Sequence, residues 1–266
     1  MKVIASVGLL TASLLPFLSN GKPPSDSRQH WAFQPVKHLK LPDIKDEAWA
    51  LNPIDRFILA KLEAKGLDPN PSAKPAQLLR RAHLDLIGLP PTLSEQEAYA
   101  RKPDLTALVN DLIDRPGYGE RYARHWLDVV RYADSNGYER DAAKPEVWRY
   151  RDYVIRSLNT DKPFDQFIIE QLAGDEVEDA TTETILATGF NRLGPWDDEP
   201  ADFAVDRFDQ LDDLVNTTAQ AFLGLTMGCA RCHDHKFDPL LQTDYYSMVA
   251  IFNPLKRPQS GRSELT

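Results

Sequence analysis

The sequence predicts an all-α fold, an irregular multi-helix domain with an extended N-terminal arm. Apolar residues recur at steps of three and four over long stretches, which is the spacing of one helix face. Helix-start and helix-stop residues flank these stretches, as with Asn52 and Pro53 before the first and Gly66 after it. No stretch alternates apolar and polar residues in the way that a half-buried strand would.

The expected helices follow one another from residue 52 almost to the C-terminus. Gly88 and the Pro90-Pro91 pair stop the second helix, and Ser94 with Glu97 has the spacing of a capping box for a short third. The strongest amphipathic pattern runs over 204–223 and is closed by Gly224. The other helices are expected over 53–65, 76–87, 104–115, 119–133, 146–158, 164–173, 181–189 and 243–252.

The amino-acid composition limits the classes of protein to which this chain can belong. Hydrophobic residues make up 42% of the 266 residues and charged residues 27%, as in ordinary soluble globular proteins. The net charge of −9 argues against a nucleic-acid partner, because such proteins are usually basic. It fits a solvated surface and a positively charged redox partner protein.

The first 21 residues have the pattern of a signal peptide. Lys2 precedes an uncharged apolar run from Val3 to Leu18, and Ser19-Asn20-Gly21 has the small residues of a cleavage site. The alternative is an uncleaved segment that anchors the chain in a membrane. The sequence thus predicts an exported protein, periplasmic or extracellular. We expect an extended arm over 22–48, the helical domain over 49–255 and a tail or truncated linker over 256–266.

The run Cys229-Ala230-Arg231-Cys232-His233 carries the chemistry, and its cysteines are the only two in the chain. C-x-x-C-H is the attachment signature of c-type haem. On one helical turn, residues i, i+3 and i+4 lie together, so both thiols can reach the haem vinyl groups while His233 reaches the iron. We predict one covalent haem c. Arg231 and Lys236 are candidates for pairing with the haem propionates, or else are solvated surface cations.

The sequence does not decide which residue binds the iron opposite His233. His125 lies beside Tyr122 and Trp126 on what we expect to be the buried flank of helix 119–133, which would aim its imidazole at the iron. Met248 lies on the apolar face of the last helix, where Met is more often core filler. A five-coordinate iron is the third alternative. Met227 and His235 are too close in sequence to His233 to reach the opposite haem face.

The sequence resembles the planctomycete-type secreted cytochrome domain, a family of unknown function that carries C-x-x-C-H. The resemblance implies an exported, helical, haem-c-type protein, usually followed by a second uncharacterised domain where this chain ends at Thr266. It is carried by Asn52–Leu62, Arg80–Thr92, Tyr118–Tyr138, Pro163–Asp175, Asn216–Pro239 and Tyr245–Asn253. We expect an electron-transfer module of a larger redox or degradative system.

Other interpretations of the motif remain open. A catalytic domain could use haem or a metal to activate a small molecule. A non-haem interaction domain could carry a Cys229–Cys232 disulfide, which export favours. A zinc site could combine Cys229, Cys232, His235 and Asp238, although structural zinc sites usually have two spaced ligand pairs.

Overall fold

The computed structural model describes residues 27–139, 141–197 and 199–256, and in these residues it is all-α, as predicted. The expected signal peptide and most of the expected tail lie outside the described residues. Among the described helices, none combines the length and the apolar character needed to cross a membrane. The helices are α1 (Pro53–Ala64), α2 (Pro75–Leu86), α3 (Leu93–Arg101), α4 (Leu105–Ile113), α5 (Pro116–Val129), α6 (Trp148–Asn159), α7 (Phe164–Ala173), α8 (Thr182–Ala187), α9 (Phe203–Thr218) and α10 (Gln242–Phe252).

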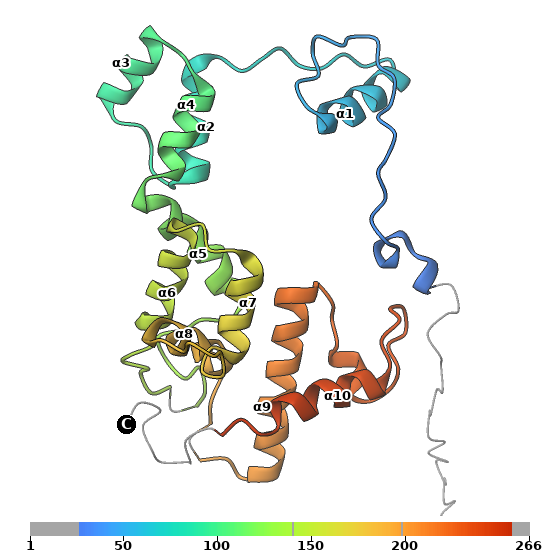
Figure 1. The fold of residues 1–266 in the computed structure, drawn as a ribbon, viewed down its shortest axis with the longest axis vertical. Coiled ribbons are helices and arrows are strands. Elements are labelled where there is room, and N and C mark those ends of the chain that lie inside the picture. The colour runs from blue at the N-terminus through green and yellow to red at the C-terminus, as the bar shows by residue number, and fades with distance from the viewer. Residues whose placement is uncertain (1–26, 140, 198, 257–266) are drawn as a thin grey trace, which may run out of the picture.

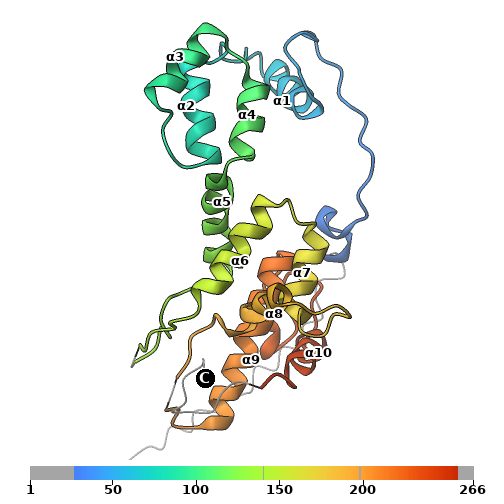
Figure 2. The ribbon, with the colours of Figure 1, turned by 60° about the vertical axis from the view of Figure 1, so that its left-hand side comes forward.

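The helices form groups along the chain (Figures 1 and 2). Helix α1 stands apart on extended segments, α2, α3 and α4 pack together, and α5 leads from them to the remaining helices. The described part of the arm before α1 is largely exposed rather than packed on the domain, since Trp31 is 81% exposed. Its only regular structure is the two 3-10 turns Ser27–Gln29 and Trp31–Phe33.

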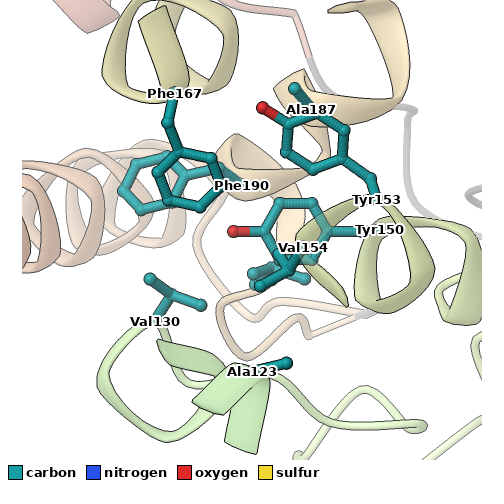
Figure 3. Packing of buried hydrophobic residues seen from close by; sticks show 9 residues of the cluster. Ala123, Val130, Tyr150, Tyr153, Val154, Phe167, Ala187 and Phe190 are labelled. Carbon is teal, nitrogen blue, oxygen red and sulfur yellow. The ribbon is translucent and has the colours of Figure 1, made fainter. Parts of the chain in front are cut away.

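The first hydrophobic core lies where α5, α6 and α7 meet the segment after α8 (Figure 3). Helix α6 buries residues at spacings of three and four, which is the helical period. The Tyr153 ring stacks on Phe167 at 5.9 Å between centroids. The buried members of this core are Ala123, Val130, Tyr150, Tyr153, Val154, Phe167, Ala187, Phe190 and Leu193.

The second core joins α9 and α10 to the residues between them. It confirms the predicted apolar face of α10, where Tyr245, Val249 and Phe252 are buried and Met248 is partly buried. It also buries Leu211 and Val215 of the predicted face of α9, together with Leu214, Ala219, Met227 and Ala230.

Several local predictions were wrong by one or more residues. The capping box of α3 is formed by Thr92 and Glu95, not by Ser94 and Glu97. Helix α5 begins at Pro116, because proline suits the first helical position, and ends at Val129. Its buried positions are Gly119 and Ala123 within the helix and Val130 directly after it.

That shift of face moves His125 to the exposed side of α5, contrary to the prediction. Val129, one helical turn further along, is likewise 51% exposed. The His125 ring contacts Tyr122, 6.0 Å away between ring centroids. The buried-flank argument for His125 as an iron ligand therefore fails.

Candidate functional site

The C-x-x-C-H run directly follows α9. Asp202 caps the start of α9 by accepting hydrogen bonds from the amides of Ala204 and Val205. At its end the helix widens into a π-helical turn, Ala219–Leu223. Gly224 then turns the chain with a φ of 65°, which glycine adopts without the steric penalty of a Cβ atom. The long amphipathic segment 204–223 was thus predicted correctly, apart from its widened last turn.

The run itself forms a short 3-10 helix, Gly228–Arg231, rather than an α-helical turn. The amide of Cys232 donates to the carbonyl of Cys229 at 3.3 Å, which brings the two cysteines onto one turn. Ala230 is fully buried and Met227 is 3% exposed in the second core, so they anchor the turn. We call residues 227–233 the CxxCH turn.

The reactive side chains of the CxxCH turn face solvent. Cys229, Cys232 and His233 are all exposed, and both thiols are free. The disulfide of the interaction-domain alternative is therefore absent from the structure. The CxxCH turn has a buried anchoring side and an exposed side that presents two thiols and an imidazole.

His233 has the hydrogen bond that a metal-binding histidine needs. Its Nδ1 lies 2.8 Å from the carbonyl oxygen of Asp234. A carbonyl only accepts, so we assign the ring proton to Nδ1, which leaves the lone pair of Nε2 available. A backbone carbonyl on the second ring nitrogen is a common way to orient a ligating histidine.

The CxxCH turn is tied to α10 by backbone and side-chain hydrogen bonds. The Asp234 carboxylate accepts from the amide of Gln242 at 2.8 Å. The carbonyl of Arg231 accepts from the Gln242 amide nitrogen Nε2 at 3.2 Å and from the Tyr246 hydroxyl at 3.1 Å. These contacts hold the turn against the first helical turns of α10.

The Arg231 guanidinium ties the same turn to α9. It lies 2.8 Å from an Asp209 oxygen and 3.4 Å from an Asp212 oxygen, and its carbon is 5.5 Å from the Phe208 ring centroid. The hydrogen bond to Asp209 raises the pKa of Arg231, and Asp212 adds to this. Asp212 also accepts a hydrogen bond from the hydroxyl of buried Tyr245. Arg231 is therefore engaged within the protein, whereas exposed Lys236 lies 5.2 Å from the Phe237 ring centroid.

His235 has a structural contact of a different kind. It is 7% exposed, and its Nδ1 accepts hydrogen bonds from the amides of Phe237 at 3.3 Å and Asp238 at 2.8 Å. The ring proton then belongs on Nε2, so neither nitrogen offers a lone pair to a metal. In the described part of the chain, no group of three His, Cys, Asp or Glu side chains is arranged to hold a metal ion. The four residues of the zinc alternative are thus not arranged as a metal site.

Met248 is partly buried against the second core, the position of a packing residue. Met227 is also buried there, on the anchoring side of the CxxCH turn. Burial does not favour His125, as described above. The ligand opposite His233 remains a prediction.

Comparison with known families matches residues 53–257 to PSCyt2, described as a protein of unknown function (DUF1549). The chain belongs to the PSCyt2 family. The matched region includes every α-helix described above and the whole CxxCH turn. No curated protein and no solved structure matches the chain. PSCyt2 membership therefore supplies no reaction, and the chemistry must be argued from the site.

Sequence reasoning missed the residues that hold the CxxCH turn of this PSCyt2 chain. Asp209 and Asp212 are three apart on the helix that leads into the motif, and the motif contains an arginine. Residues three apart share a helix face, so this acidic pair is a usable signal. Gln242 and Tyr246 carry no comparable signal, because only folding brings α10 to the turn.

Proposed function

We propose that this PSCyt2 chain is an exported c-type haem protein that serves as an electron-transfer module of a larger redox or degradative system. The observation that carries the proposal is the exposed CxxCH turn, with two free thiols and an imidazole whose Nε2 is available. Its buried side already has its partners in the second core. The exposed side therefore has no evident role in packing.

The residues present fit haem c. Each thiol would add across one vinyl group, with sulfur bonded to one carbon and the proton to the other, so the step requires no oxidant. His233 would bind the iron through Nε2. Bound haem would supply one-electron chemistry. Electron transfer at a solvent-exposed site fits a partner that docks on the surface, and the net charge of −9 favours a basic one.

The test is expression of the full chain in a host that matures c-type cytochromes. We expect coloured protein whose haem stays on the polypeptide after denaturation, because thioether bonds survive unfolding. Cys229→Ala with Cys232→Ala should abolish this covalent haem, while Lys236→Gln, an exposed neighbour, should keep it. Colourless wild-type protein would sink the proposal.

The number of ligands on the haem iron would distinguish electron transfer from small-molecule chemistry. We propose His125 and Met248 as the residues to substitute with alanine, each by itself, while recording the haem spectrum with and without cyanide. A spectral change in one variant identifies the sixth ligand. Cyanide binding to wild type, with neither variant changed, would instead indicate an open iron position and a catalytic role.

A further inference from the structure

A cavity of about 520 Å³ lies between α2 and α3, in the group of helices that precedes α5 (Figures 1 and 2). Each helix contributes three residues at spacings of three and four, which therefore share one helix face. They are Ala76, Leu79 and Arg80 of α2 and Gln96, Tyr99 and Ala100 of α3. None of the lining residues belongs to α9, α10 or the CxxCH turn, so the cavity is separate from the proposed haem site.

The basic side chains of this cavity are not paired with carboxylates. Lys74 and Arg80 are the charged residues of the lining, and no Asp or Glu belongs to it. Neither side chain has an ion pair or a hydrogen bond to any described residue. By contrast, the Arg115 guanidinium in the same group of helices is already bonded to Glu95 and Asp111. Two cations are therefore left for an anion, although the whole chain has a net charge of −9.

The first turn of α2 adds a further positive end to the cavity. Pro75 has no N–H, and the amides of Gln77 and Leu78 donate to the Lys74 carbonyl at 2.8 and 3.1 Å. The amide of Ala76, which lines the cavity, has no acceptor among the described residues. Free amides and the helix dipole make the beginning of a helix favourable for an anion.

Tyr99 provides a polar group on an otherwise apolar floor. It is 8% exposed, and Leu79 on the facing helix is 2% exposed. The Tyr99 hydroxyl has no hydrogen-bond partner among the described residues. Buried tyrosines usually have a partner for this group. The free hydroxyl therefore indicates that a molecule in the cavity completes its hydrogen bonding.

We propose that this cavity binds an organic phosphate, a phosphate monoester with a small apolar body. The three terminal oxygens of the phosphate would meet the Lys74 ammonium, the Arg80 guanidinium and the amide at the beginning of α2. The Tyr99 hydroxyl would donate to an oxygen of the ligand, and the apolar floor would contact its body. The volume falls within the roughly 300–1,000 Å³ of small-molecule pockets, which leaves room for both parts. This inference does not depend on haem.

The test titrates the purified full chain with phenyl phosphate, followed by protein-observed NMR, and repeats the titration with inorganic phosphate, phenol and benzoate. We expect phenyl phosphate to shift resonances of α2 and α3. It should bind about tenfold more tightly than inorganic phosphate, which lacks the apolar body, and than phenol, which lacks the charge. Benzoate should bind several-fold more weakly, because it offers two oxygens and a single charge. Inorganic phosphate, phenol or benzoate binding as tightly as phenyl phosphate, or no binding of phenyl phosphate, would overturn the proposal.

Two variants separate binding from damage to the fold. Tyr99→Phe keeps the ring and should weaken phenyl phosphate several-fold without loss of stability, because the hydroxyl has no partner to lose. Arg80→Gln should weaken phenyl phosphate about tenfold and leave phenol unchanged. Arg81→Gln is the matched control with the same change of charge, because exposed Arg81 is the next residue of α2 and does not line the cavity. Phenyl phosphate affinity that is unchanged by Arg80→Gln, or weakened equally by Arg81→Gln, would rule out the site.

Discussion

His83 on α2 is a buried histidine without a hydrogen-bond partner among the described residues. It is 1% exposed, and neither ring nitrogen is bonded. Burial lowers its pKa below the ordinary 6.5, an effect that Glu95 and Asp111 oppose and Arg115 reinforces. Folding therefore favours the neutral ring relative to an unfolded chain, which would protonate it near pH 6.5. Stability should fall as the pH drops below that value, because the unfolded state then binds the additional proton.

His83→Leu tests this, because leucine is apolar and leaves no unpaired nitrogen in the core. At pH 8 we expect the variant to be as stable as wild type or more stable. Between pH 7 and pH 5 the wild type should lose stability relative to the variant. Urea unfolding at several pH values measures both quantities. Parallel pH profiles of the two proteins would show that His83 is not the group responsible.

Arg231 holds the CxxCH turn against α9 through Asp209 and Asp212. Arg231→Gln removes the cation between Asp209 and Asp212, so we expect less haem per chain and an altered haem spectrum. Its direct cost in unfolding free energy should be only about 1 kcal/mol, since the pair is partly exposed. Arg231→Lys should restore part of the haem content, because an ammonium can still meet one carboxylate. Arg156→Gln is the control, because Arg156 pairs with Glu183 of α8. Identical haem content and spectra in Arg231→Gln and Arg156→Gln would refute the positioning role.

Helix ends in this protein depend on local capping hydrogen bonds. The sequence often contains two residue pairs with the spacing that such a cap requires. In α3 the Thr92 hydroxyl accepts from the Glu95 amide, and the Glu95 carboxylate accepts from the Thr92 amide at 2.7 Å. Burial of Glu95 opposes its ionisation, but the hydrogen bonds from Thr92 and from Arg115 outweigh it and lower the pKa of Glu95 to about 2. This contribution to stability is present above pH 4.5 and is lost as the pH falls toward 2.

Thr92→Ala should therefore lower the free energy of unfolding by about 1 kcal/mol at neutral pH, through loss of the cap. Ser94→Ala should cost much less, although Ser94 and Glu97 have the same sequence spacing as a capping box. Thermal unfolding of both variants measures the difference. A larger loss in Ser94→Ala would contradict the observed register.

The molecule couples its two cores through a few aromatic side chains. The Trp126 ring of the first core lies 5.6 Å from Phe222, which belongs to the widened end of α9, and 5.1 Å from Phe167. Phe222 also lies 5.3 Å from Phe190. Because α9 leads directly into the CxxCH turn, haem bound there should stabilise the second core first and the first core through these rings.

Phe222→Ala should weaken this coupling and cost about 1–3 kcal/mol, less than a fully buried Phe→Ala change because the ring is only partly buried. We expect calorimetry to show one unfolding transition of α5–α10 in wild type and two in the variant. Haem attachment should then raise only the transition that belongs to α9 and α10. A single transition in the variant, shifted as a whole by haem, would show that other contacts couple the cores.

The helical fold was predictable because helix periodicity and helix-ending residues are local properties of the chain. Asn52 with Pro53, Gly66, Gly224 and the apolar stripe of α10 all act within a few residues of themselves. The same holds for the CxxCH motif, whose chemistry is set by residue type and spacing. These features specify where helices form and predict which side chains would bind haem.

Tertiary structure decided which of several faces is buried and which partners meet. It placed His125 outside and His83 inside, and it paired Arg231 with Asp209 of α9. It also brought two basic side chains to a cavity between α2 and α3. Burial and ion pairing depend on elements far apart in the chain, so their free energies cannot be assigned from one segment's periodicity. The amino-acid sequence by itself determined the helices and the CxxCH motif, and packing alone determined what surrounds them.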